Sequence, residues 1–388
     1  MGDRRGPADR RSPITDPAVV AVAAVGLLLL GVTLVWPGGS LLAFGRNNRG
    51  QLGDGTTADR ARPVAVAGRP GAVAVVGGGE HALALTGDGS LWGWGGNREG
   101  QLGGEGDRAR PAPVEGIEGV TAVAAGYFHT LALTRGGTVL SWGDDTFGQL
   151  GRASEQTCGV VACGRRPAPV AGLAGVGAIA AGFNHNLVLS ADGAVLAWGN
   201  GAVGQLGDGE LAGGPTLRRV RLPGPAAAIA AGGSQGLALL RDGSVWAWGS
   251  VDARRTFLAL PRPVEGLPVA IAIAAGEHHA LALSADGRVW SWGDNQFAQL
   301  GDDSPPLGRP VAAPVPGLRA IVAIAAGTNH SAALDRDGSV WTWGWNEFGQ
   351  RGDGTRQTRA AAAPVPDLPR ARGVGVGADQ TFVLVAGS

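Results

Sequence analysis

The sequence predicts a seven-bladed β-propeller preceded by one membrane-spanning helix. Three observations carry this prediction. A repeat unit of about 50 residues occurs seven times, the last unit lacks a strand that the start of the repeat region supplies, and a charge-free apolar stretch precedes the first unit. We therefore divide the chain into a polar tail at residues 1–17, a transmembrane signal anchor at 18–36 and the propeller at 37–388.

The predicted anchor follows a tail that carries four arginines and three aspartates. Residues 18–36 contain no charged side chain, and as a helix they would extend about 28 Å, close to the ~30 Å hydrocarbon core of a bilayer. Trp36 ends the stretch at the depth of interfacial aromatics. A cleavable signal peptide and a buried core helix are the alternatives. The stretch is longer than a signal-peptide core, no small-x-small site follows it, and the rest of the chain has an all-β pattern, so an uncleaved anchor is favoured.

Each repeat unit has the pattern of a four-stranded antiparallel blade. In one copy a small-residue strand, Ala-Ile-Ala-Ala-Gly, ends at Gly276 and is followed by His279. Alternating Leu-Ala-Leu and Val-Trp-Ser-Trp segments come next and indicate strands with one face packed between sheets. The Asp286-Gly287 pair between them is typical of a tight hairpin. A loop and a Pro-Val strand at 314–315 complete the unit.

The small-residue strand is expected to lie nearest the central axis, where seven sheets converge and large side chains do not fit. The glycine that ends it is expected to allow a sharp backbone turn. This glycine is found at Gly126, Gly182, Gly232, Gly276 and Gly327. An aromatic-glycine pair marks the third strand of every unit, and its aromatic residues are Phe44, Trp94, Trp142, Trp198, Trp248, Trp292 and Trp343.

The two ends of the repeat region predict how the ring closes. The last unit stops near Val385 and lacks its third strand, whereas residues 39–45 form such a strand with no unit before it. Pairing the two segments completes the seventh blade and leaves no open edge in the ring.

Three segments resemble the repeats of the regulator of chromosome condensation family. They are Gly-Gln-Leu-Gly-Asp-Gly-Thr at 50–56, Ala-Gly-x-x-His-Thr-Leu-Ala-Leu at 125–133 and Asp-Gly-Ser-Val-Trp-x-Trp-Gly at 242–249. The resemblance covers about residues 39–385 and implies a propeller. The founding member of the family is a guanine-nucleotide exchange factor for a small GTPase and also binds chromatin. Other members only bind proteins, among them a secreted bacterial propeller that inhibits β-lactamases, so the resemblance implies the fold more narrowly than the activity.

No residue pattern indicates a catalytic, cofactor or metal site, so we predict a non-enzyme. The chain has no lysine, which excludes Schiff-base chemistry and a P-loop. Basic and acidic residues balance at 32 each, so no nucleic-acid partner is expected. One histidine per unit (His81, His129, His185, His279 and His330), replaced by Gln235 and Gln380 in two units, would be spread around the ring. We interpret these side chains as structural hydrogen-bonding groups.

Cys158 and Cys163 are the only cysteines, and both lie in the longest unit. Two cysteines alone cannot complete a four-ligand zinc site. In an exported domain they would form a small disulfide loop, and in a cytosolic one they would be two thiols. We favour the disulfide on condition that the propeller is exported.

Strand parity places the turn before each repeat histidine and the long Gly-Gln-Leu-Gly loop on one face of the ring. The Asp-Gly hairpins fall on the other face. On the first face, the two residues before each repeat His or Gln differ between units. Repeat scaffolds place their binding residues in such variable loops. That the rings there only pack against neighbouring loops is the alternative. The predicted partner-binding residues are Tyr127, Phe128, Phe183, Asn184, Glu277, His278 and Asn329.

The resulting prediction is a monomeric, non-enzymatic, membrane-tethered module that binds a protein or peptide. A guanine-nucleotide exchange factor is one alternative, and a secreted-type enzyme inhibitor or an enzyme using the propeller cleft is another. Basic residues exceed acidic ones by one before the anchor, which favours a cytoplasmic N-terminus and an extracytoplasmic propeller in a single-pass cell-membrane protein. The short linker 37–39 would hold the hairpin face near the bilayer.

Overall fold

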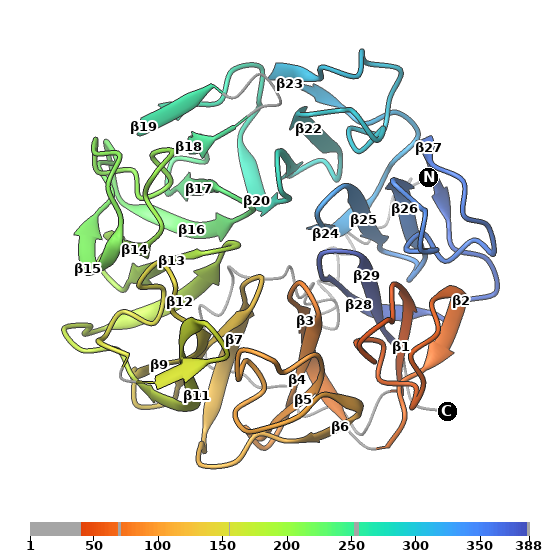
Figure 1. Ribbon diagram of the computed structural model, residues 1–388. Helices are drawn as coiled ribbons and strands as arrows, with labels where there is room; N and C mark the ends of the chain where they lie inside the picture. Colours follow the sequence, from red (N-terminus) through yellow and green to blue (C-terminus); the bar gives the residue numbers. More distant parts are fainter. Residues whose placement is uncertain (1–39, 69–70, 155, 252–255, 386–388) are drawn as a thin grey trace, which may run out of the picture.

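A ring of seven twisted antiparallel sheets surrounds a central axis in the computed structural model, which describes residues 40–68, 71–154, 156–251 and 256–385 (Figure 1). These residues form 29 strands. No helix long and apolar enough to cross a bilayer occurs within the described ranges. The anchor predicted at 18–36 lies outside the described residues.

The blades are numbered here in chain order. Blade 1 contains β3 (Ala72–Gly77), β4 (His81–Thr86), β5 (Leu91–Gly95) and β6 (Arg108–Pro113). Blade 2 contains β7 (Val120–Ala125), β8 (His129–Thr134), β9 (Val139–Asp144), β11 (Val161–Pro169) and, outermost, β10 (Gln156–Cys158). Blade 3 contains β12 (Val176–Ala181), β13 (His185–Ser190), β14 (Val195–Gly199) and β15 (Gly214–Arg219).

Blade 4 contains β16 (Ala226–Ala231), β17 (Gln235–Leu240), β18 (Val245–Ser250) and β19 (Phe257–Pro263). Blade 5 contains β20 (Ala270–Ala275), β21 (His279–Ser284), β22 (Val289–Gly293) and β23 (Arg309–Pro314). Blade 6 contains β24 (Ile321–Ala326), β25 (His330–Asp335), β26 (Val340–Gly344) and β27 (Arg359–Pro364). Blade 7 contains β28 (Ala371–Val376), β29 (Gln380–Val385), β1 (Ser40–Gly45) and β2 (Arg60–Ala65).

Blade 7 joins the two ends of the described chain, which confirms the predicted closure. Strand β1 pairs antiparallel with β29, with Leu41 opposite Leu384 and Ala43 opposite Phe382, and Figure 1 shows the two strands side by side. The N-terminal segment also supplies the outer strand β2, so the closing blade combines two strands from each end. Because β1 pairs with both β29 and β2, no strand edge inside this blade is left without hydrogen bonds.

The hydrophobic core lies between blades rather than within one sheet. One cluster, for example, joins Leu281, Leu283 and Val289 of blade 5 to Ile324 and Trp343 of blade 6. The innermost strands carry small residues, as expected for strands that line a narrow channel. Because every core cluster is shared by neighbours, the ring is stabilised mainly by contacts around its circumference.

The glycines at the ends of the inner strands have a different role from the one predicted. Gly126, Gly182, Gly276 and Gly327 do not adopt the left-handed conformation, so a sharp turn does not require them. A Cβ atom at each position would instead overlap the imidazole of the repeat histidine three residues later. The glycine is needed because the histidine ring lies against its Cα.

Candidate functional site

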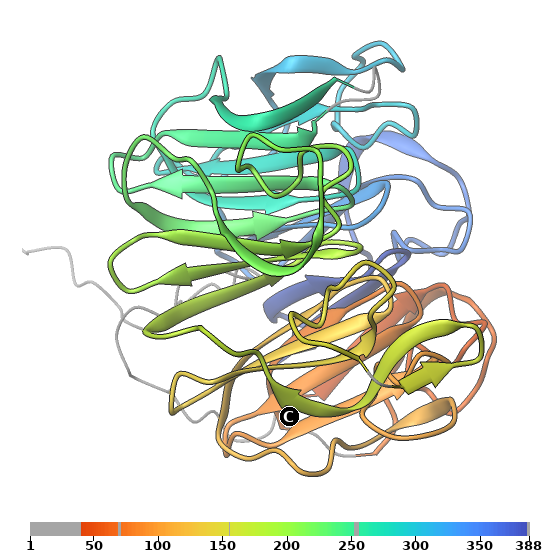
Figure 2. The same ribbon diagram turned by 60° about the vertical axis from the view of Figure 1, so that its left-hand side comes forward.

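The strand register fixes which loops share a face of the ring. His279, at the start of β21, pairs with Gly293, at the end of β22, so the turn before β21 and the loop after β22 lie at the same end of the blade. The same register holds in the other blades, for example between His185 and Gly199. Figure 2 shows several sheets nearly edge-on, with turns at both ends of their strands. We call the end with the inner turns and long loops the loop face, and the opposite end the hairpin face.

A repeated hydrogen-bond network joins neighbouring blades just beneath the loop face. At blades 5 and 6, His279 Nε2 lies 2.9 Å from Ser331 Oγ, whose hydroxyl donates to the Gln299 carbonyl at 3.0 Å. The Trp343 indole donates to the same carbonyl at 2.9 Å. Because the serine proton is used by that carbonyl, His279 must donate from Nε2. We call this network the inter-blade joint.

The residue in the next blade decides whether the joint uses histidine or glutamine. Histidine is present where the following blade offers a side-chain acceptor, as in the pairs His81–Thr130, His129–Asn186, His279–Ser331 and His330–Thr381. Glutamine is present where the following blade offers only alanine, Ala280 or Ala82. Gln235 then donates to the backbone carbonyls of Gly276 and His279, and Gln380 to that of Gly79.

His185 is the exception, since the facing residue is Gly236 and its Nε2 has no hydrogen-bond partner. The Trp248 ring occupies the space that a side chain at Gly236 would need.

The joint histidines are fully buried and uncharged. Burial lowers the pKa of His81, His185 and His279 to about 3 and that of His330 to about 4, and it also lowers the pKa of His129. Their positions around the ring agree with the structural interpretation from the sequence. Among the described residues, no three His, Cys, Asp or Glu side chains gather as a metal site would require.

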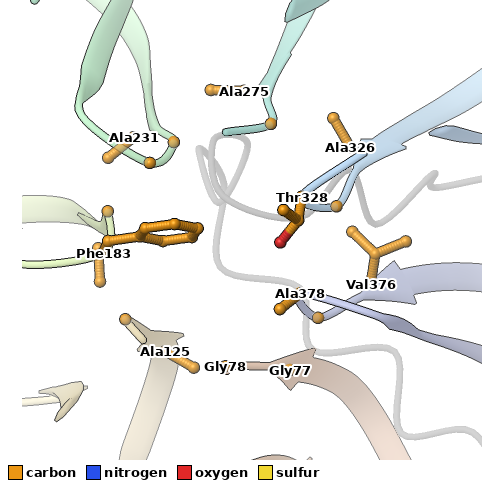
Figure 3. Close-up of a pocket in the computed structure, with 18 of the residues that line it drawn as sticks. Gly77, Gly78, Ala125, Phe183, Ala231, Ala275, Ala326, Thr328, Val376 and Ala378 are labelled. Atoms are coloured by element: carbon orange, nitrogen blue, oxygen red, sulfur yellow. The ribbon is translucent and has the colours of Figure 1, made fainter. Parts of the chain in front are cut away.

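A cavity of about 130 Å³ opens where the inner turns of the loop face surround the central channel (Figure 3). The first residue of every variable pair lines it, whereas the second does not. The lining residues from these pairs are Gly79, Tyr127, Phe183, Gly233, Glu277, Thr328 and Ala378. We call this region the channel mouth.

Backbone hydrogen bonds close the channel mouth into a continuous ring. Tyr127 N donates to Phe183 O at 3.1 Å, Thr328 N donates to Ala378 O at 2.9 Å, and Gly79 N donates to Tyr127 O at 2.9 Å. Equivalent bonds cross the remaining blade junctions, so each inner turn is held by its neighbour. The side chains of the mouth therefore project from a fixed backbone, as a recognition site requires.

Two aromatic rings, Tyr127 and Phe183, form one wall of the mouth, and the Phe128 ring packs against Tyr127. Tyr127 makes edge-to-face contacts with both Phe128 and Phe183, each with ring centroids 4.7 Å apart. Tyr127 also lies against Gly79, where any side chain would overlap it. In Figure 3 the Phe183 ring projects into the cavity. The three rings pack against one another and still remain half-buried, so they combine the two interpretations that the sequence allowed.

Carboxylates occupy other parts of the mouth. Glu277 lies against Gly233 and contacts His278, with Oε1 and Nε2 3.6 Å apart. Asp379 pairs with Arg46 at 3.3 Å. Burial raises the pKa of both Glu277 and Asp379. The pKa of Tyr127 is raised by burial first and then by the nearby charge of Asp379, which places this carboxylate close to the phenol.

The structure separates the predicted site residues into two groups. Tyr127, Phe183 and Glu277 meet at the channel mouth, and Phe128 supports Tyr127 from behind. Asn184, His278 and Asn329 are the second members of their pairs and lie outside the cavity lining. The sequence pattern did not distinguish these positions, because only the turn conformation decides which of two adjacent residues faces the axis.

A second aromatic cluster on the loop face was not predicted. Trp345 contacts Phe297 and Phe348, each with centroids 5.3 Å apart, and the Arg46 guanidinium lies 5.0 Å from the Phe348 centroid. Phe297 and Phe348 occupy the position two residues before the repeat glutamine, where other units have Arg49 or Glu99. The variability of this loop position was the signal in the sequence that could have indicated the second aromatic cluster.

Cys158 and Cys163 form a disulfide across the β10–β11 hairpin at the outer edge of blade 2. Val160, at the tip of this hairpin, is 96% exposed. The bond fixes an extension that projects from the ring without touching the channel mouth.

A family model described as RCC1-like domain matches residues 14–384 of the chain. Prp20p of Saccharomyces cerevisiae, whose structure was described together with its binding to Gsp1p and histones, superposes with a TM-score of 0.80 at 25% identity. The superposition covers 91% of this chain and 93% of Prp20p.

Curated relatives match over short segments. Guanine nucleotide exchange factor SRM1 of the same yeast is 35% identical over 74 residues, which are 18% of this chain and 15% of SRM1. Human E3 ubiquitin-protein ligase HERC2 is 42% identical over 69 residues, or 17% of this chain and 1% of HERC2. The match thus spans far less than two thirds of either relative.

Proposed function

This chain belongs to the family of RCC1-like domains, and we propose that it is a non-enzymatic propeller that binds a protein or peptide partner through its loop face. One observation carries the proposal. At the same strand ends the joint residues are nearly constant, whereas the residues of the channel mouth vary from blade to blade, with only glycine occurring twice. A fixed scaffold with varied, half-exposed aromatic and acidic side chains at one place is typical of a recognition surface.

A membrane tether is a further part of the proposal. Ser40 pairs with Val385, and Gly45 pairs with Gln380 of the joint, so the described chain enters the ring at the hairpin face. An anchor at 18–36 would hold that face toward the bilayer and present the loop face outward. We place the propeller, as a monomer, outside the cytoplasm, where a disulfide is stable. Protease added to intact cells should digest it, and complete protection of a chain that is digested after lysis would contradict this placement.

Guanine-nucleotide exchange is the second candidate function. The similarity to Prp20p and SRM1 favours it, since the first is described as binding Gsp1p and the second is named an exchange factor. A cytoplasmic propeller would be needed for this activity. The same protease experiment therefore separates the two candidates.

Site-specific photo-crosslinking in cells tests the proposed binding face. A photoreactive phenylalanine analogue at Phe128 or Phe183 should give a discrete adduct, and the analogue at Arg241, in a hairpin-face turn, should give none. Alanine at Tyr127, Phe128 or Phe183 should raise the dissociation constant of the captured complex about thirtyfold. This factor corresponds to the ~2 kcal/mol that is lost when a buried aromatic anchor is removed. Arg241→Ala and Asp242→Asn should leave it intact. Adducts from the hairpin face alone would overturn the assignment.

A further inference from the structure

We propose that the channel mouth binds a single cationic side chain, an arginine or lysine at the tip of a partner segment, between the Tyr127–Phe183 wall and the Glu277 carboxylate. The inference rests on the proposed function and adds the chemistry of the partner. Four observations support it: the local charge, the unpartnered acceptors, the aromatic wall and the size of the cavity.

The carboxylates near the mouth come from three blades, and only Glu277 lines the cavity itself. Besides burial, the charge of Asp379 raises the pKa of Tyr127, that of Arg46 lowers it, and those of Glu80 and Glu277 raise it. Arg46 pairs with Asp379, and Arg49 lies 3.5 Å from Glu80. Within the described ranges, no arginine forms an ion pair with Glu277, whose neighbour His278 is charged only when protonated. Glu277 is thus the carboxylate available to an incoming cation.

Two buried oxygen atoms lack hydrogen-bond partners, one on Thr328 in the cavity lining and one on Asp379, which follows the lining residue Ala378. The Asp379 side chain is 8% exposed, and its Oδ1 has no donor although Oδ2 faces Arg46. Thr328 Oγ1 is likewise buried without a partner, and in Figure 3 it lies on the cavity side of the turn between β24 and β25. A buried acceptor without a donor is costly, so both atoms favour a ligand that brings N–H groups.

The aromatic wall favours a cation over a neutral polar group. Cations are attracted to the faces of aromatic rings, and the attraction is stronger where water is partly excluded. In Figure 3 Phe183 projects into the cavity from one side and Thr328 lies across from it. Tyr127, which packs against Phe183, and Glu277, in the blade before that of Thr328, also line the cavity. A guanidinium between them would contact a ring on one side and a carboxylate on the other.

The cavity is large enough for the end of one side chain. Its volume is about 130 Å³, and a guanidinium has four heavy atoms. Below the mouth the channel is lined by alanine, glycine and valine, whose side chains cannot form a hydrogen bond or an ion pair with a charged group. The cation would therefore stop at the level of the carboxylates, and the partner backbone would lie over the loop face.

The single tyrosine of the chain provides a direct probe. Full-length protein labelled with 3-fluorotyrosine carries fluorine only at Tyr127, at the mouth itself. A blocked Gly-Gly-Arg-Gly-Gly peptide should shift this ¹⁹F resonance saturably. The same peptide with citrulline, which keeps the shape of arginine without its charge, should not.

Three variants identify the groups involved. Glu277→Gln should lower the affinity for the arginine peptide about tenfold, as expected for loss of a charge-assisted contact. Phe183→Leu keeps an apolar side chain without the aromatic face, and it should lower the affinity for the arginine peptide about threefold. Glu210→Gln removes an exposed carboxylate from another loop of the same face and should change nothing.

The absence of a shift with the arginine peptide, an equal shift with citrulline, or full binding by Glu277→Gln would each overturn the inference. If loop-face crosslinks persist in that case, the proposed function stands and only the chemistry of its partner is wrong. If arginine binds but crosslinks arise only from the hairpin face, the inferred pocket stands and the proposed binding face is wrong.

Discussion

The inter-blade joint and the channel mouth are built from residues two positions apart. The joint side chains are buried between blades, whereas the mouth side chains face the channel. In blade 5, Glu277 faces the channel at the mouth, and His279 is fully buried between blades 5 and 6. The joint repeats nearly the same arrangement around the ring, with glutamine in place of histidine in two blades and an unpartnered Nε2 at His185. The mouth residue varies from blade to blade, and only glycine occurs twice.

This difference shows how a repeat ring separates stability from recognition. The joint connects side chains and carbonyls of neighbouring blades, so an uncompensated change there leaves a buried polar group unpaired. The mouth is held by backbone hydrogen bonds, which do not depend on the side chain. Residues such as Tyr127 and Glu277 can therefore vary while the ring keeps its geometry.

Removing the closing strand should have the largest effect on the ring. Deletion of residues 40–45 removes the strand that hydrogen-bonds to both β29 and β2 and exposes two strand edges. We expect aggregation or loss of cooperative unfolding, measured by size-exclusion chromatography and thermal melting. Deletion of six residues from the tail before residue 18 is the control. A monomeric product with unchanged melting would disprove the closure.

Acid should unfold the ring through the joint histidines. Burial holds the pKa values of four of them at about 3 to 4, below the ~6.5 of an unfolded histidine. The unfolded chain therefore binds more protons, and stability falls as pH decreases below about 6.5. At pH 5.5 the loss is about 1.4 kcal/mol for each of His81, His185, His279 and His330, or ~6 kcal/mol for the four, comparable to the net stability of a domain. Tryptophan fluorescence should show unfolding between about pH 5.5 and 4.5.

His185→Gln is the matched variant for the acid experiment. His185 lacks an Nε2 partner, and glutamine occurs naturally at this position in blades 4 and 7. Removing one titrating group should move the unfolding midpoint to lower pH. A ring that melts at the same temperature at pH 4 and pH 7 would contradict the buried, neutral state of these histidines.

The sequence was sufficient for the blade number, the closure and the identity of the loop face, because these depend on strand periodicity and parity. It was insufficient for the mouth. Whether Tyr127 or Phe128, and Glu277 or His278, faces the channel depends on the backbone conformation of a two-residue turn. The role of the inner-strand glycines was also misjudged, since the overlap with the histidine rings is visible only in three dimensions. The choice between histidine and glutamine follows a residue in the next blade, 49 positions later for His81 but at the opposite end of the chain for Gln380, and it required the register between blades.

The tryptophans of the joint provide a smaller, matched comparison. Trp343 Nε1 donates to Gln299 O, whereas Trp292 Nε1 has no hydrogen-bond partner, because the loop of blade 4 lacks the Gly-Gln-Leu-Gly segment. Trp343→Phe should lower the free energy of unfolding by about 1–2 kcal/mol more than Trp292→Phe. Urea denaturation at constant m-value measures the difference. Equal losses would mean that the shared carbonyl contributes nothing to the joint.

The separation of joint and mouth is tested most directly by comparing His279→Ala with Glu277→Ala in the full-length chain. We predict that His279→Ala lowers the free energy of unfolding by about 2–4 kcal/mol, through a lost buried hydrogen bond and a new cavity. Glu277→Ala should change it by less than about 0.5 kcal/mol, since the side chain is half-exposed and the turn is held by its backbone. Equal destabilisation by the two substitutions, measured by urea denaturation, would contradict the account.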